Sequence, residues 1–179
     1  MRLEMRLEEE ELRQVTLYAV ICARPVLPIF EAIRPQDVRP RDALAGAEAF
    51  AGGQRRTAAL RASAWAARAA AREVDRESAA HAAYAAGHAA AAAFLHPIAS
   101  PHQVKHILGA AIHQALAFER GTPEDEESVH ERLRWAASLA NATVRDVLQR
   151  FPPPDPGRGR FGRLLSDLDA QLRDERPKG

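Results

Sequence analysis

Three histidines at helical spacing are the residues of this sequence most suggestive of chemistry. His102, His106 and His113 lie within about 40° of one another on an expected helix, at about 100° per residue. His102 and His106 are one turn apart and could share a metal ion, whereas His113 lies about 10 Å further along the axis, too far for the same ion. A metal site would need a further ligand, His81 or His88, from another helix. The alternative is that these imidazoles lie on a polar face or at helix contacts.

A second histidine stripe lies on the alanine-rich segment 79–93. His81, Tyr84 and His88 follow one another at i, i+3 and i+7. Its two imidazoles are about two turns apart and cannot be neighbouring ligands. Gly87 removes a side chain inside a helix, at a cost of about 1 kcal/mol relative to alanine. We therefore expect a close helix crossing at Gly87 with His88 hydrogen-bonded at the contact, or else a ligand or partner role for His88.

A third set combines arginine and tryptophan on one helix face. Its members, at i, i+4, i+7 and i+11, are Arg61, Trp65, Arg68 and Arg72. These two residue types are enriched among the positions that dominate binding in protein interfaces, and they can stack as cation–π pairs. Two interpretations stay open. Either the set is a partner-binding surface, or Trp65 packs inward while the guanidinium groups pair with acids of a neighbouring helix.

No complete catalytic motif is present. No histidine is followed by aspartate, so the doublet of the helical metal phosphohydrolases is missing. His130-Glu131 lacks a second histidine four residues after the first, and the glycines between 157 and 162 lack the lysine of a phosphate-binding loop. Cys22 lies in an apolar helical stripe, so we expect it to be buried and unreactive. The sequence therefore predicts neither enzyme activity nor a cofactor.

The spacing of apolar residues predicts helices along the chain, and no segment alternates convincingly with period two. Gly52-Gly53 is expected to end one helix, and Asp75 to cap the alanine-rich one. Ser100 and Thr122 each precede a proline, and both are expected to begin a helix with a capping box. The first five expected helices cover about residues 8–22, 40–52, 57–72, 76–95 and 101–119.

The C-terminal third predicts a long helix, a linker and a short helix. Apolar residues from Val129 to Phe151 keep helical spacing for about six turns. A proline run then forms a stiff linker, and the amphipathic segment that follows either docks on the bundle or swaps to a neighbouring chain. We predict an all-α fold, a single bundle of about six to eight helices. Its expected segments are the bundle at 1–151, the Pro/Gly linker at 152–160 and a C-terminal helix and tail at 161–179.

Length, composition and charge restrict location and partners. The 179 residues suit one domain, and 46% hydrophobic residues can form a core. A single cysteine and an N-terminus that mixes charges with apolar residues favour a cytoplasmic protein without a signal peptide or membrane anchor. The net charge is +1, and only residues 35–72, with seven arginines against three acids, carry a local charge of +4. Binding to nucleic acid or to a membrane is not expected, and a homodimer is compatible with the sequence.

Four segments together resemble the immunity protein family of bacterial polymorphic-toxin systems. They are residues 17–31 (LYAVICARPVLPIFE), 34–41 (RPQDVRPR), 62–72 (ASAWAARAAAR) and 85–89 (AAGHA). The resemblance extends over about residues 12–119, roughly 60% of the chain, and does not reach the segment after Thr122. Trp65 stands where the family pattern has a smaller aromatic residue.

The resemblance implies a helical, cytoplasmic, non-enzymatic protein that neutralises a cognate toxin by stoichiometric binding. The family pattern falls here on Pro28, Glu31, Asp37, Arg39, Pro40 and His88, and it assigns none of them a catalytic role. Two other functions stay open on the residues alone. One is a metal-binding helical protein or metalloenzyme that uses His102 and His106. The other is a nucleic-acid-associated helical accessory protein.

Overall fold

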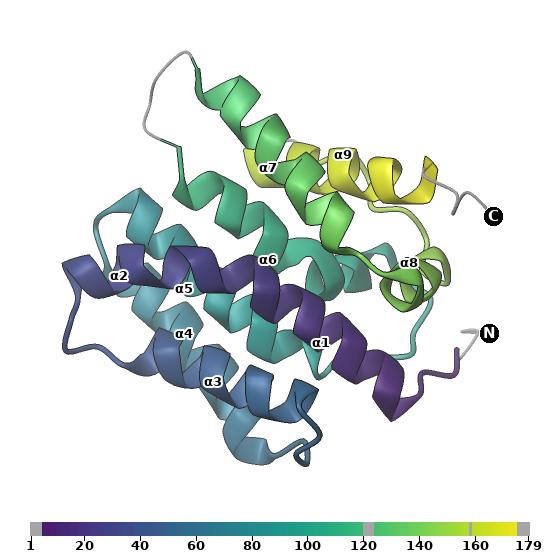
Figure 1. Cartoon of the computed structure of the whole chain (residues 1–179), viewed down its shortest axis with the longest axis horizontal. Coiled ribbons are helices and arrows are strands. Elements are labelled where there is room, and N and C mark those ends of the chain that lie inside the picture. The colour runs from purple at the N-terminus through teal and green to yellow at the C-terminus, as the bar shows by residue number, and fades with distance from the viewer. Residues whose placement is uncertain (1–4, 120–123, 158, 175–179) are drawn as a thin grey trace.

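The computed structural model describes residues 5–119, 124–157 and 159–174, and these residues form helices and no β-strand (Figure 1). The helices are α1 (Glu9–Ala23), η1 (Arg24–Val26), α2 (Leu27–Ile33), α3 (Arg39–Ala51), α4 (Ala58–Glu73), α5 (Glu77–Ala92), η2 (Pro101–Gln103), α6 (Val104–Ala117), α7 (Asp125–Leu139), α8 (Ala142–Gln149) and α9 (Arg160–Asp174), where η marks a 3₁₀ helix. The predicted all-α bundle is confirmed. We count α1, η1 and α2 as one long helix, because they follow one continuous path from Glu9 to Ile33.

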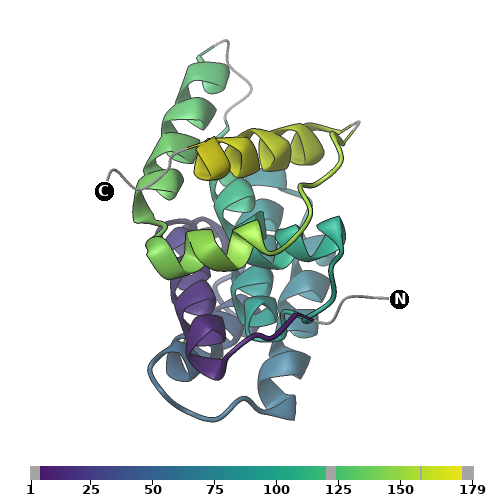
Figure 2. The ribbon, with the colours of Figure 1, turned by 90° about the vertical axis from the view of Figure 1, so that its right-hand side faces the viewer.

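Two helices, α5 and α6, form the centre of the bundle. The buried residues of α5 are eight alanines and Gly87, and these small side chains allow α1, α2, α3, α4 and α6 to pack around it. In α6, 12 of the 14 residues are buried, and they include the polar side chains of His113 and Gln114. Figure 2 shows α7 and α9 at one end of the molecule and α3 and α4 at the other. Thus α5 and α6 connect the two ends.

The long run Glu9–Ile33, which comprises α1, η1 and α2, has the length and composition of a membrane-crossing helix. In the bundle it packs against α3, α5, α6 and α8. Its inward face includes Val15, Cys22 and Phe30, none of which is exposed to solvent. This run therefore supplies one layer of the core. As expected, Cys22 is a buried free thiol, and burial raises its pKa to about 12.

The single long helix predicted up to Phe151 is wrong, because the chain breaks between α7 and α8. Ala140 has an extended ψ of 107° and ends α7. Asn141 is the N-cap of α8, and its side chain accepts a hydrogen bond of 3.0 Å from the N–H of Val144. Periodicity did not reveal the break, since the apolar residues on both sides of it are buried in the same core. The expected cap at Thr122 lies outside the described residues.

Two predicted caps also differ from the structure. α5 begins at Glu77 with Arg76 as its N-cap, so the predicted cap at Asp75 is wrong. The Ser100 hydroxyl accepts a hydrogen bond of 3.3 Å from the N–H of His102 and thereby caps η2. It does not form the predicted capping box, because the chain enters α6 through a 3₁₀ turn.

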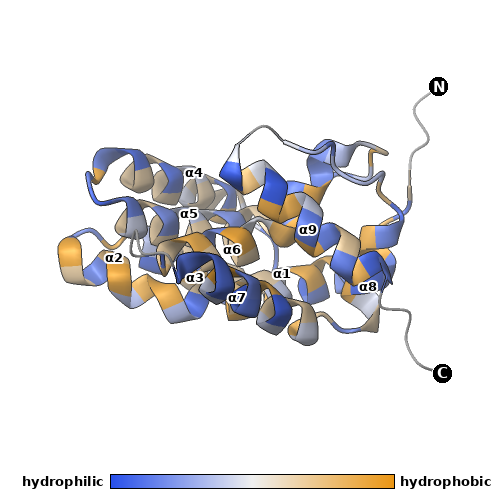
Figure 3. Ribbon diagram, turned by 90° about the horizontal axis from the view of Figure 1, so that it is seen from above, coloured by the Kyte–Doolittle hydropathy of each residue, from blue (hydrophilic) through white to orange (hydrophobic). Residues whose placement is uncertain are grey.

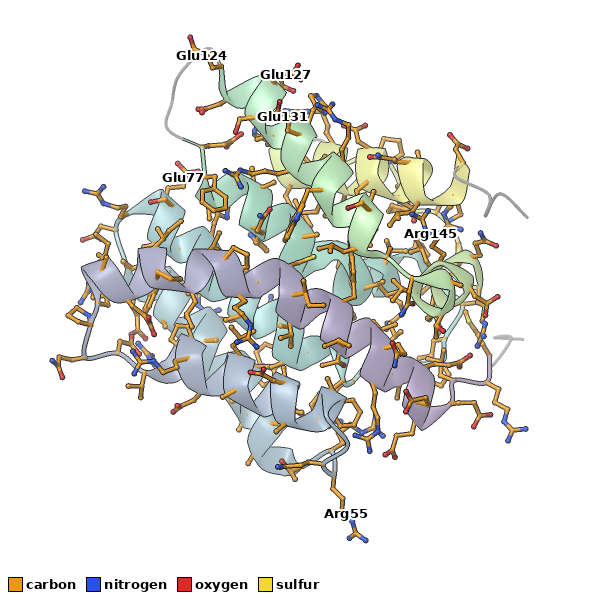
Figure 4. All side chains as sticks on the ribbon, in the orientation of Figure 1. Arg55, Glu77, Glu124, Glu127, Glu131 and Arg145 are labelled. Atoms are coloured by element: carbon orange, nitrogen blue, oxygen red, sulfur yellow. The ribbon has the colours of Figure 1, made fainter. Side chains whose placement is uncertain are left out.

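The last helix, α9, docks on α6, α7 and α8 of the same chain. It buries four leucines, Leu164, Leu165, Leu168 and Leu172. Arg145, a residue of α8, lies close to α9 (Figure 4). Its guanidinium donates hydrogen bonds to the carbonyls of Ala137 (2.9 Å), Ala140 (3.0 Å) and Leu172 (3.2 Å). The α7–α8 break and the end of α9 are therefore held by one side chain.

Seen from above, α7 is largely hydrophilic while α6 carries hydrophobic residues (Figure 3).

Candidate partner-binding site

A cleft of about 680 Å³ lies between α4, the end of α5 and the start of α6. It is lined by Arg61, Ala64, Trp65, Arg68, His88, Ala91, Phe94, His96, His102, Lys105 and His106. None of these lining residues is acidic. The cleft joins most of the predicted arginine–tryptophan set to three of the predicted histidines, which the sequence alone could not place side by side.

The first wall of the cleft is the outer face of α4. The hydroxyl of Thr57 caps this helix by accepting a hydrogen bond of 3.1 Å from the N–H of Leu60. Its inner face consists mostly of alanines that pack on α5, and Trp65 is left 62% exposed. The guanidinium carbon of Arg68 lies 5.3 Å from the centre of the Trp65 ring, within cation–π range. The interpretation in which Trp65 packs inward is therefore wrong.

The two outer arginines of the predicted set differ in position. The guanidinium carbon of Arg61 lies 4.6 Å from the centre of the Phe94 ring, so Arg61 extends from α4 toward the end of α5. Arg72, in the last turn of α4, is exposed and does not line the cleft. The structure thus brings together Arg61, Trp65 and Arg68 and leaves Arg72 apart.

The α4–α5 and α5–α6 contacts that shape the cleft depend on two glycines. A Cβ at Gly87 would lie 3.0 Å from Cγ of Arg68 and 3.2 Å from the carbonyl oxygen of Ala64, so the predicted close crossing at Gly87 is present. A Cβ at Gly109 would lie 2.5 Å from Nδ1 of His88. Gly109 therefore admits the His88 ring between α5 and α6, a role that the sequence analysis did not identify.

The cations of the cleft have no acidic partner among the residues that the structure describes. No carboxylate there forms an ion pair with Arg61, Arg68 or Lys105, and Nε of Arg68 is buried without a hydrogen-bond acceptor. Arginines elsewhere are paired, for example Arg39 with Glu73 at 2.6 Å and Arg150 with Glu11 at 2.5 Å. The cleft is therefore a local concentration of uncompensated positive charge.

Two imidazoles of the cleft are neutral at pH 7. Burial lowers the pKa of His88 to about 3, with a further contribution from the positive charge of Arg68, while a hydrogen bond to the Lys105 backbone acts in the opposite direction. Burial also lowers the pKa of His106 to about 4, and His96 and His102 add to the shift. The Nδ1 atoms of His88 and His106 are buried without a partner in the described structure. The expected hydrogen bond of His88 is thus made to α6.

The candidate metal ligands do not converge. Within residues 5–119, 124–157 and 159–174, no group of three or more His, Cys, Asp or Glu side chains could hold a metal ion. His102 and His106 line the cleft, but the Nδ1 of His88 faces Gly109 and His81 lies against His113. The metal-binding interpretation therefore lacks its ligand set in the described part of the chain.

His81 and His113, which do not line the cleft, belong to a second cluster around His113 of α6. Nδ1 of His81 lies 2.9 Å from Nδ1 of His113, and the rings of Tyr84 and His88 are each centred 5.1 Å from that of His113. Phe161 of α9 completes the cluster at 4.9 Å. Burial holds the pKa of His113 well below its ordinary value, with smaller contributions from nearby positive groups. We call these five residues the histidine–aromatic stack. His113 therefore lies where α6 contacts α5 and α9.

Most of the family pattern positions fix the loop between α2 and α3. Arg41 donates a hydrogen bond of 2.6 Å to the Glu31 carboxylate. Arg39 bridges Asp37 at 2.7 Å and Glu73 at 2.6 Å, and so attaches the loop to the end of α4. These hydrogen bonds from Arg39 lower the pKa values of Asp37 and Glu73. The acidic and arginine positions of the pattern therefore hold the fold and lie outside the cleft.

The two prolines of the pattern lie at the starts of helices. Pro28 occupies the first turn of α2 and Pro40 the first turn of α3, where a helix does not require the backbone N–H. Pro40 is also buried. Of the six pattern positions, His88 is the one that contributes to the cleft.

Comparison with models of protein families gives a match over most of the chain. A family model described as "Imm-5 like putative immunity protein" matches residues 5–144. The match covers α1 to α7 and the beginning of α8, and it includes every residue that lines the cleft. No curated protein and no solved structure matches the chain.

Proposed function

The chain belongs to the Imm-5 like putative immunity protein family, and from this premise we propose that it neutralises a cognate bacterial toxin by stoichiometric binding in the cytoplasm. The observation that carries the proposal is the extent of the match, 140 of 179 residues (5–144), which includes the whole cleft. Binding alone is sufficient for neutralisation, because a protein that covers a toxin's working surface need not transform it.

The composition of the cleft supports a role in protein binding. Arginine and tryptophan are the residue types most enriched at positions that dominate interface affinity. Here Trp65 is largely exposed beside Arg61 and Arg68, on a helix that is itself packed closely on α5. A preformed surface loses little conformational entropy when a partner binds. We therefore assign the partner-binding face to α4 and to the adjoining ends of α5 and α6.

Neither alternative function has comparable support. A metal-binding protein would need a ligand set that the described residues do not form. A nucleic-acid-binding protein would need an extended series of phosphate contacts, whereas the chain has a net charge of +1 and many of its arginines are paired with acids. We accordingly propose a non-enzymatic protein whose partner is another protein.

Co-expression tests the proposal directly. The chain is produced together with the product of the adjacent gene, and growth is compared with that of cells that express the neighbouring product alone. We expect rescue of growth and co-purification as a complex of defined stoichiometry, measured by light scattering after gel filtration. The same measurement reports whether the free chain is a homodimer. If no neighbouring product is toxic, or none is bound, the proposal fails.

A further inference from the structure

We propose that the cleft receives an acidic segment of a protein partner, whose carboxylates lie between the arginines of α4 and Lys105 of α6. The identity of the partner as a toxin rests on the proposed function, but the chemistry of the cleft does not. Three observations support the assignment: the uncompensated charge, the excess of hydrogen-bond donors, and the shape of the walls.

The first observation is the missing counter-charge. Arg61, Arg68 and Lys105 line one cavity, and the described residues supply no carboxylate to any of them. The acidic residues Glu124, Glu127 and Glu131 lie along α7 (Figure 4), a helix that packs against α6 and α9. The charge of the cleft is therefore left for a partner to neutralise.

The second observation is the excess of donors. Arginine and lysine only donate hydrogen bonds, and a carboxylate at neutral pH only accepts them. Nε of Arg68 is buried with no acceptor, and Nδ1 of His106 is buried with no partner. The neutral His106 ring carries one N–H, so it can add a single donor without a further charge. A carboxylate that enters the cleft would supply acceptors, and arginine can bind it in the two-pronged geometry.

The third observation is the shape of the cleft. Ala64 and Ala91 are the small residues of its lining and give it depth, while Trp65 and Phe94 add aromatic surface. Such a cavity suits side chains that have an apolar stem and an anionic head. Its volume of about 680 Å³ is within the range of cavities that bind small ligands, and it is therefore large enough for the side chains of a short segment. The glutamate and aspartate side chains of an acidic peptide segment have both the apolar stem and the anionic head.

A protein carboxylate fits better than a nucleic acid. Binding to nucleic acid requires basic residues spread along a stripe that follows the phosphates. Here the uncompensated cations converge on one cavity. Of the arginines in the α2–α3 region, Arg39 and Arg41 are already paired with acids at 2.6 Å. The positive surface is therefore compact and not extended.

Peptide binding to the full chain provides the test. The probe is an acidic octapeptide of glutamate, aspartate and leucine. It is compared with its glutamine and asparagine counterpart and with a single-stranded DNA octamer. Trp65 serves as the fluorescent reporter after Trp135→Phe removes the other tryptophan. We expect the acidic peptide to bind at least about tenfold more tightly than either comparison ligand, a difference of about 1.4 kcal/mol.

Charge-reversal variants locate the binding. Arg61→Glu and Lys105→Glu should each weaken peptide binding about tenfold or more, as loss of a buried ion pair does in interfaces. Arg72→Glu is the matched control, since it makes the same change in net charge on α4 but lies outside the cleft. It should change the affinity less than about twofold, because an exposed charge acts weakly at a distance. Lys105→Ala is the milder variant, and circular dichroism establishes that each variant is folded.

The outcomes separate this proposal from the proposed function. Equal weakening by Arg72→Glu and Arg61→Glu, or tighter binding of the DNA octamer, would overturn the assignment of the cleft. If a toxin complex forms but survives both reversals, the immunity function stands and the cleft assignment fails. If the cleft binds the acidic peptide while no neighbouring gene product is bound, the cleft assignment stands and the immunity function fails.

Discussion

The cleft and the histidine–aromatic stack are two histidine-rich regions that share His88 but have opposite characters. In the stack, Phe161 of α9 covers His113, and the adjacent Arg160 is paired with Glu119 at 2.6 Å. In the cleft, Trp65 remains exposed and no described acid approaches the cations. The comparison shows that histidine type and spacing do not determine a role. Coverage by a neighbouring helix decides whether an imidazole supports the core or faces a partner.

Acidification should destabilise both regions and should have the largest effect on stability. The buried imidazoles have pKa values below the ordinary 6.5, about 3 for His88 and about 4 for His106. The unfolded chain therefore binds protons that the folded chain does not, and stability is complete above pH 6.5 and falls as the pH is lowered toward 4. Each group should remove about 2 kcal/mol of unfolding free energy at pH 5, since one pH unit corresponds to about 1.4 kcal/mol. Urea titrations from pH 7.5 to 5 measure this loss.

A variant in the stack provides the control for the acid effect. His113→Phe keeps a ring of similar size and removes one titrating group, so its stability should fall less steeply between pH 6.5 and 5. The carboxylates paired with arginines do not affect the slope between pH 6.5 and 5. Their pKa values are lowered, as for Glu11 and Asp37, so the stability that they contribute is lost only below about pH 4.5. An identical slope in His113→Phe and the wild type would contradict this prediction.

Gly109→Ala should displace His88, the residue that the cleft and the stack share. The new Cβ would lie 2.5 Å from Nδ1 of His88, and that ring also packs against His113 at 5.1 Å. We expect a loss of about 2 to 3 kcal/mol of unfolding free energy, as overpacking of a core produces. In the background of His88→Ala the same substitution should be much less harmful, because the obstructing ring is gone. Chemical denaturation of the four proteins of this cycle measures the coupling, and simple additivity would contradict the proposed contact.

Phe161→Ala should open the stack while leaving α4 in place. Phe161 is partly buried and contacts the rings of both His88 and His113. Its loss should reduce stability by about 2 kcal/mol, somewhat below the usual penalty for a fully buried phenylalanine. Hydrogen exchange should speed up in α9 while α4 is unaffected. Equal acceleration in α4 would show that the two regions are not separately supported.

The sequence predicts features that arise within one helix or at one contact. The helix end at Gly52, the close crossing at Gly87 and the burial of Cys22 each follow from local residue type and spacing, and the structure contains all three. The break before Asn141 was missed because apolar periodicity continues across it. An asparagine followed by a short helical repeat was the available signal.

Predicting the cleft from sequence was harder, because it depends on contacts between distant segments. Arg61 and Trp65 precede Lys105 and His106 by about 40 residues, and only the packing of α4, α5 and α6 brings them to one cavity. Arg72 is separate from its set because it lies in the last turn of α4, whereas the cleft is lined by the earlier turns of α4 and the start of α6. Helical spacing identifies residues on one face, but it does not show where a neighbouring helix ends.

The smallest expected effect on stability, and the sharpest contrast with Phe161→Ala, belongs to Trp65→Ala. Because Trp65 is 62% exposed and its ring contacts mainly Arg68, its removal should change the unfolding free energy by no more than about 0.5 kcal/mol. Partner binding should nevertheless fall about tenfold or more, since tryptophan and arginine are enriched among the few residues that dominate binding in protein interfaces. Denaturation of the free chain and titration with the co-purified partner measure the two quantities on one variant. A large loss of stability with unchanged affinity would place Trp65 with the stack and remove the distinction between the two regions.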